Sequence, residues 1–251
     1  PFYIEEVKKY DAILMVSFGD GTKLPDYITL EPGENVVENS HIYNFSRIMR
    51  NYSPAIYLRT VGNIARNNEI HDSSGNAIIF NGNDHTIKYN EIYDVVKEVD
   101  DAAAIYAFIE KVRRGTVISH NYIHDLYSAE TSVVGASGVY TDGRRDGTTV
   151  TNNLFENIQG TAYLLNCGRD NTFTDNICIN VGKVVHYPRT CDTKELADLA
   201  QYGLYENGIH TTAPYAKYPH LANILNDDPA WSKYNVIKDN VVIDSVSDIN
   251  L

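Results

Sequence analysis

Two groups of carboxylates stand apart from the rest of this 251-residue sequence. Asp100 and Asp101 precede the apolar run AAAIYA, and Asp142 ends the run GVYTD. Hydrolysis of a glycosidic bond needs two carboxyl groups that flank the bond, one protonated to assist the leaving oxygen and one ionised to attack or to activate water. Like-charge repulsion within Asp100–Asp101 is expected to raise the pKa of one member, which suits it to be the acid. These carboxylates indicate a glycosidase site.

A recurring phrase, Asn-x-Ile-x-Asp, marks the elements that must position them. It reads NEIHD from Asn68, NEIYD from Asn90 and NYIHD from Asn121, with looser copies from Asn153 and Asn240. Recurrence every 22 to 32 residues predicts one supersecondary unit stacked on copies of itself. Each copy has three short β-patterned runs between Gly, Asn and Asp, and no sustained 3.6-residue period. We therefore predict an all-β fold, a right-handed parallel β-helix (solenoid) of about eight coils.

The positions of the phrase have separate structural roles. The recurring Asn is expected at a turn, where it tolerates left-handed backbone and stacks on the Asn of the next coil. The residue two positions later is expected to point inward and build an apolar stack of Ile70, Ile92, Ile123, Phe155 and Cys178. The phrase thus specifies the fold and not the chemistry.

Aligning the second strand of successive coils predicts an outward face. Because side chains alternate across a strand, inward Ile78, Ile105 and Val139 leave two rows outside. These rows are Ile79, Tyr106, Tyr140, Leu164 and His186, and Asn81, Phe108, Asp142, Asn166 and Pro188. Small residues are expected to lower one edge of the face: Ala77, Ala104, Gly138 and Ala162.

Such a face is a trough suited to a sugar. Aromatic rings pack on the apolar faces of the sugar, while Asn, Asp and His bind its hydroxyls. The expected sugar-binding residues are Tyr106, Tyr140, Asn166 and His186. The alternative is β-propensity alone, because the chain has 19 tyrosines.

A basic row follows this face, formed by Lys111, Arg113, Arg114, Arg144, Arg145 and Arg169. One interpretation is a grip on a substrate carboxylate or on its hydroxyls, and the other is solvated turn charge offset by Glu110, Asp146 and Asp170. We predict substrate binding for Arg145 and Arg169, and turn charge for Arg113 and Arg114.

The strand alignment conflicts with a catalytic pair. Asp101 lies before the second strand and Asp142 at its far end, seven positions away. An extended chain would separate them by about 23 Å, whereas glycosidase carboxyls lie about 5 to 9.5 Å apart. A catalytic pair therefore requires residues 98–103 to bend back.

Five segments resemble a large group of bacterial right-handed β-helix proteins. They are GNDHTIKYNEIYDVVKEVDDAAAIYA (82–107), RGTVISHNYIHD (114–125), GVYTDGRRDGTTVTNN (138–153), GRDNTFTDNI (168–177) and YPHLANILNDDPAWSKYNVIKDNVV (218–242). The resemblance covers about residues 39–244. The group includes glycoside hydrolase family 141, whose known activities are α-L-fucosidase and xylanase.

The resemblance implies a catalytic pair. That family uses two aspartates on neighbouring coils, and the matching positions here are Asp101 and Asp142. The sequence departs from the family pattern at Ala103, at Gly143 and at Pro188, which replaces an acid. These departures leave the pair intact and put the substrate in doubt. The resemblance also implies a secreted, periplasmic or cell-surface location.

A long insertion interrupts the repeat from about residue 190 to 234. Residues 194–202 are expected to form a short helix, and prolines mark turns after it. Its aromatic and histidine side chains either border the trough or pack against the rod: His210, Tyr215, Tyr218 and Trp231.

Net charge and composition limit the classes of partner that the protein is expected to bind. A net charge of −12 disfavours nucleic acid and anionic membranes, and no apolar run approaches a membrane-spanning length. Three cysteines are too few for a disulfide framework and lack metal-site spacing, and Cys178 is expected to be a buried thiol. We expect one domain over residues 1–251, as a piece of a longer protein.

The leading hypothesis is a hydrolase of a polysaccharide or its side chains that uses Asp101 and Asp142 and needs no metal or cofactor. The second is a polysaccharide lyase or epimerase on a uronate polymer, which needs a base and often Ca²⁺. The third is a non-catalytic carbohydrate-binding rod. The basic row favours the lyase, and two acids in a trough favour the hydrolase.

Overall fold

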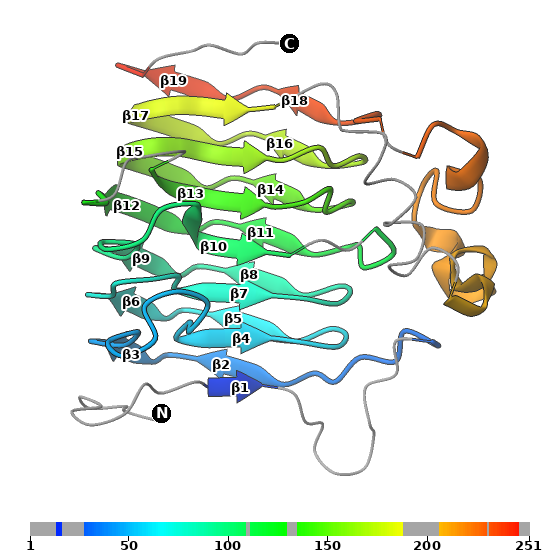
Figure 1. Cartoon of the computed structure of the whole chain (residues 1–251), viewed down its shortest axis with the longest axis horizontal. Coiled ribbons are helices and arrows are strands. Elements are labelled where there is room, and N and C mark those ends of the chain that lie inside the picture. Colours follow the sequence, from blue (N-terminus) through cyan, green and yellow to red (C-terminus); the bar gives the residue numbers. More distant parts are fainter. Residues whose placement is uncertain are drawn as a thin grey trace.

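Short parallel strands stack into a rod in the computed structural model of this chain (Figure 1). The model describes residues 14–16, 28–108, 111–129, 135–187, 206–229 and 231–245. Within this part, every strand pairs in parallel with the strand one coil away. The predicted all-β parallel β-helix is confirmed.

The rod has three faces, and each coil visits them in order. The first face contains β2 (Val36–Glu38), β5 (Ile64–Arg66), β8 (Thr86–Lys88), β11 (Val117–Ser119), β14 (Thr149–Thr151), β16 (Thr172–Thr174) and β18 (Val236–Lys238). The second contains β3 (His41–Tyr43), β6 (Glu69–His71), β9 (Glu91–Tyr93), β12 (Tyr122–Leu126), the first halves of β15 (Leu154–Leu165) and β17 (Ile177–His186), and β19 (Val241–Ile243).

The third face contains β1 (Leu14–Val16), β4 (Ile56–Leu58), β7 (Ile78–Phe80), β10 (Ala102–Ala107), β13 (Ala136–Thr141) and the second halves of β15 and β17. The described strands therefore make six complete coils, with β1 before them and β18 and β19 after them. The predicted count of about eight coils is not confirmed by the described residues.

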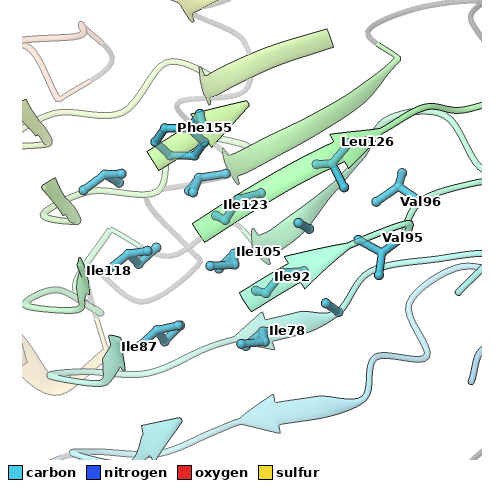
Figure 2. Packing of buried hydrophobic residues seen from close by; sticks show 14 of the residues in the cluster. Ile78, Ile87, Ile92, Val95, Val96, Ile105, Ile118, Ile123, Leu126 and Phe155 are labelled. Atoms are coloured by element: carbon cyan, nitrogen blue, oxygen red, sulfur yellow. The ribbon is translucent and has the colours of Figure 1, made fainter. Parts of the chain in front are cut away.

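Apolar side chains from the three faces meet along the axis of the rod. The predicted stack is confirmed, because Ile70, Ile92, Ile123, Phe155 and Cys178 pair in this order across β6, β9, β12, β15 and β17 and are fully buried. Figure 2 shows Ile92, Ile123 and Phe155 facing the side chains of the other two faces. Cys178 is a free buried cysteine, and burial raises the pKa of its thiol to about 12.

The recurring asparagines form a ladder at the turns between the first and second faces, and all its members except Asn240 are buried. Each side-chain amide donates to the side-chain oxygen of the next at 2.9 to 3.0 Å, through Asn68, Asn90, Asn121, Asn153, Asn176 and Asn240. The stack is confirmed, but the left-handed residue is the one before each ladder member, as at Asn67 (φ 53°) and His120 (φ 56°). The preceding residue makes the sharp turn, which frees the asparagine to point inward and bond its neighbours.

The insertion lies beside the rod and not on its end (Figure 1). Its described part contains three short 3₁₀ helices, η2 (Glu206–Thr211), η3 (Ala213–Lys217) and η4 (Ile224–Asn226). The helix expected at residues 194–202 lies outside the described residues. Among the helices that are described, none has the length and apolar character to cross a membrane.

Candidate active site

The outward row of the third face follows the predicted register. Tyr106 pairs with Tyr140, Tyr140 with Leu164, and Leu164 with His186, on successive strands. Ile79, Ala103, Tyr106, Tyr140 and Leu164 pack together outside the main core. The face is therefore a second apolar layer on the outer surface of the rod.

The small residues next to this row do not form its edge, contrary to the prediction. Ala77, Ala104 and Ala162 belong to the interior cluster. A Cβ added to Gly138 would lie 2.8 Å from the ring of Phe155, so this position also faces inward. Strict alternation fails here because the strand carries two consecutive inward residues.

That break in alternation resolves the distance problem between the two aspartates. In β10, Ala103 faces outward, whereas Ala104 and Ile105 both face the interior, so the strand bends at this point. Asp101 precedes the bend with a left-handed backbone (φ 55°). The Asp100 side chain fixes the turn, because its Oδ1 accepts hydrogen bonds from the backbone N–H groups of Asp101 (2.7 Å) and Gly135 (3.0 Å).

The bend brings the carboxyl groups of Asp101 and Asp142 to one hydroxyl. Tyr140 Oη lies 3.2 Å from Asp101 Oδ1 and 3.0 Å from Asp142 Oδ1. These two carboxylate oxygens are therefore at most 6.2 Å apart, the sum of the two distances. Asp101 is exposed and Asp142 is half-buried. This upper limit is compatible with the separation of about 5 to 9.5 Å that glycosidase carboxyls use.

Asp142 accepts hydrogen bonds from three side chains. Tyr106 donates to Oδ2 at 2.5 Å, and Tyr140 and Asn166 lie 3.0 Å from Oδ1. Such a set of donors holds an ionised carboxylate in one orientation. Burial raises the pKa of the Tyr106 and Tyr140 hydroxyls above the usual range, so both remain protonated donors.

The environment of Asp101, unlike that of Asp142, favours a protonated carboxyl. Although the residue is exposed overall, partial desolvation of its carboxyl raises the pKa of Asp101, and the negative charges of Asp142 and Asp100 raise this pKa further, whereas the hydrogen bond to Tyr140 opposes the shift. A raised pKa suits a carboxyl that must carry a proton to a leaving group. The Tyr140 hydroxyl has a single hydrogen, which it can donate either to Asp101 or to Asp142.

Tyr106 and Tyr140 are covered and do not offer their rings to a ligand. They are 1% and 4% exposed. The ring of Tyr52, from the loop between β3 and β4, lies 5.8 Å from that of Tyr106 and 5.2 Å from that of Phe108. The two tyrosines therefore orient Asp142 instead of stacking on a sugar. The sequence gives no sign that Tyr52 reaches this face, because it lies outside the repeat.

His186 lies farther along the same row. It borders a hollow of about 260 Å³ that is also lined by Gln159, Gly160, Thr161, Leu164, Gly182 and Lys183. Burial and the charge of Lys183 lower the pKa of His186. A second hollow, of about 290 Å³, is lined by residues from Asn44 to Glu98. Neither hollow is lined by Asp101 or Asp142, and the first shares Leu164 with the outward row of the third face.

The basic row belongs to the interior, which corrects the prediction for Arg145 and Arg169. Both are 0% exposed. Arg145 donates to the carbonyl of Gly82 at 2.6 Å, and Arg169 bonds to the Asp227 side chain and backbone in the insertion. Neither guanidinium group can reach a ligand.

Arg114 is also buried and not the solvated charge that we predicted. It donates to Asp146 at 2.9 Å, to Asp170 at 2.6 Å and to the carbonyl of Pro219 at 3.1 Å. Lys111 lies 3.3 Å from Asp146 in the same network. These cations anchor the insertion to the turns of the rod.

The described part of the insertion, residues 206–229 and 231–234, packs against the rod, and none of its printed contacts is with Asp101 or Asp142. Tyr215 and Tyr218 are buried with Val61 and Val112, and Tyr218 bonds to Asp84 at 2.9 Å. His210 is also buried, and Trp231 is exposed. The structural role that we considered for Tyr215 and Tyr218 is therefore confirmed.

Comparison with known proteins identifies the family of this chain. The family model described as a right handed beta helix region fits residues 28–205. No curated protein and no solved structure matches the chain.

Proposed function

The chain belongs to the right-handed β-helix family, and on that premise we propose that it is a glycoside hydrolase that cleaves a polysaccharide or its side chains. The observation that carries the proposal is the spacing of Asp101 and Asp142, whose oxygens are at most 6.2 Å apart across Tyr140. Most glycosidases need this pair of carboxyls and no metal or organic cofactor. The sequence resemblance makes fucosides and xylan the first substrates to test.

The environments of the two carboxyls support a different role for each in this proposal. Asp101, with its raised pKa, gives a proton to the glycosidic oxygen as the bond to the leaving group breaks. Asp142 attacks the anomeric carbon and forms a glycosyl-enzyme ester. The ionised Asp101 then removes a proton from water as that water displaces Asp142. A separation below the 6.5 Å or so typical of inverting enzymes favours this two-step route, with retained configuration.

Neighbouring residues have supporting roles in this proposal. Tyr106, Tyr140 and Asn166 hold Asp142 by hydrogen bonds of 2.5 to 3.0 Å and act as positioning residues. The hollow beside His186 offers amide, hydroxyl and cationic groups to an adjoining sugar. The sugar-binding role predicted for His186 is therefore retained.

A lyase or epimerase is less well supported. It requires a cation to neutralise the uronate carboxylate and a base to remove a proton. Arg145 and Arg169 are buried against protein groups. The raised pKa of Tyr140 makes it a weak candidate for a base. A non-catalytic rod would explain sugar binding but not the paired carboxyls.

We also propose a secreted, periplasmic or cell-surface location, where a polysaccharide is accessible. Cys167 is disulfide-bonded, which is typical of proteins in oxidising compartments. The net charge of −12 makes nucleic acid a poor partner.

Product analysis tests the proposed reaction. Incubation with fucosylated and xylan-type oligosaccharides should release reducing sugar whose first-formed anomer keeps the substrate's configuration, as read by proton NMR. We expect no ultraviolet-absorbing unsaturated product and no loss of rate in EDTA, because the two carboxyls act without a metal. An unsaturated product, or activity lost in EDTA and restored by Ca²⁺, would support the lyase. Sugar binding without any product would support the non-catalytic rod.

The pH dependence tests the role of Asp101. Activity should fall as pH rises through its pKa, because the acid must be protonated. The Tyr140 hydrogen bond lowers this pKa, so Tyr140→Phe should move the alkaline limb of kcat/KM to higher pH and reduce kcat by about 10- to 100-fold. Tyr106→Phe is the matched control, because the carboxyl to which Tyr106 donates is that of Asp142. An alkaline limb that moves to lower pH in Tyr140→Phe would contradict the assignment.

A further inference from the structure

A separate cluster of metal-ligating side chains lies on the second face of the rod. His41 of β3 pairs with Glu69 of β6, and His71 follows on the same face of β6. One possible ligand atom from each residue lies within 4.8 Å of the others. We propose that His41, Glu69 and His71 bind a divalent transition-metal ion, with Zn²⁺ as the probe. The site is distinct from the carboxylate pair, which lies on the third face.

A hydrogen bond to Asp72 orients the ring of His71 as one ligand. Its Nδ1 lies 2.8 Å from Oδ2 of Asp72, an acceptor, so Nδ1 carries the hydrogen and Nε2 keeps its lone pair. This Nε2 faces Nε2 of His41 at 2.6 Å. Two imidazole nitrogens this close must share a proton or a metal ion. A carboxylate behind a ligating histidine is the usual outer partner of a bound metal.

The third ligand is also held by an outer partner. The Tyr93 hydroxyl donates to Oε1 of Glu69 at 2.8 Å. The same Oε1 lies 3.8 Å from Nε2 of His41 and 4.0 Å from Nε2 of His71. Ligand atoms around tetrahedral Zn²⁺ are about 3.3 Å apart, given bonds of about 2.0 to 2.2 Å. Shifts of less than about 1 Å would therefore complete the site.

Such shifts are possible because two of the three side chains are partly exposed to solvent. The side chains of His41 and Glu69 are 46% and 44% exposed, and that of His71 is 12% exposed. His71, which Asp72 orients, is the rigid ligand, and the side chains of His41 and Glu69 can move toward an ion. Two imidazoles and one carboxylate suit Zn²⁺, Ni²⁺ or Cu²⁺ better than Ca²⁺ or Mg²⁺, which prefer oxygen ligands.

A similar arrangement two coils along the rod lacks one ligand. His124 contacts Asp125 at 2.8 Å and Glu91 at 3.4 Å, as His71 contacts Asp72 and Glu69. On the neighbouring strand, Tyr93 pairs with His124, and no second histidine ring contacts it among the described residues. His124 is therefore a matched control for a histidine–aspartate pair that should not bind a metal tightly.

The test is calorimetric titration of tag-free protein with ZnCl₂ at neutral pH. We expect one saturable ion per chain and a higher Tm with Zn²⁺ than with MgCl₂, since binding to the folded state stabilises it. His41→Ala should weaken binding at least about tenfold, because it removes one of three ligands. His124→Ala should bind as the unmodified protein does.

Three results would overturn the proposal. They are no saturable binding, equal affinity in His41→Ala, and equal weakening by His124→Ala, which would indicate unspecific histidine binding. Circular dichroism checks that each variant is folded, and the exposed His41 is the position least needed for the fold. Hydrolysis by the carboxylate pair is measured separately, so failure of one proposal does not decide the other.

Discussion

Asp142→Asn should lower kcat by about 10³-fold or more and leave sugar binding nearly unchanged. The substitution keeps the size of the side chain but removes the negatively charged carboxylate that attacks the anomeric carbon. This interaction is needed chiefly in the transition state. It also makes the group a poorer acceptor for Tyr106, Tyr140 and Asn166, which hold it at 2.5 to 3.0 Å. The measurements are kcat on the substrate identified by product analysis and Kd for an oligosaccharide by calorimetry.

The control for this variant is Asp175→Asn. Asp175 is an exposed aspartate in a left-handed turn (φ 57°), a conformation that asparagine also adopts. The Asp175→Asn variant should therefore keep full activity and stability. Full turnover in Asp142→Asn would remove Asp142 from the reaction, whereas a large rise in KM with unchanged kcat would make it a binding residue.

Ile123→Asp should unfold the protein or destabilise it by more than about 4 kcal/mol, because the substitution places an unpaired carboxylate in the core. Ile123 is fully buried between Ile92 and Phe155 of the neighbouring coils (Figure 2). Water cannot reach the new charge without separating these strands. Urea unfolding followed by circular dichroism gives the change in the free energy of unfolding.

Two matched variants distinguish the effect of the buried charge on stability from the effect of the lost side-chain volume. Ile123→Val should cost about 0.5 to 1.5 kcal/mol, as one methylene group is lost. Ile177→Asp, at an exposed position two coils further along the rod, should cost about 1 kcal/mol or less, a strand-propensity effect. Similar stability of Ile123→Asp and Ile177→Asp would contradict the inward stack.

The sequence alone was enough to predict the repeating unit and its register. Asn68, Asn90 and Asn121 recur with the inward residue two positions later, and the structure stacks both sets as predicted. The row from Tyr106 through Tyr140 and Leu164 to His186 was likewise predicted. These features are readable because parallel stacking pairs equivalent positions of consecutive coils, so each contact repeats a local pattern.

Only the tertiary structure decided what departs from the repeat. Strict alternation predicted about 23 Å between Asp101 and Asp142, whereas consecutive inward residues at Ala104 and Ile105 bend the strand and bring both carboxyls to Tyr140. Arg145 and Arg169 were predicted to bind substrate, but contacts with Gly82 and with the insertion bury them. His41 and His71 meet in the same way, from separate coils. Bends and contacts across coils depend on how side chains fill space around the closed rod, and neighbouring residues in the chain do not encode that packing.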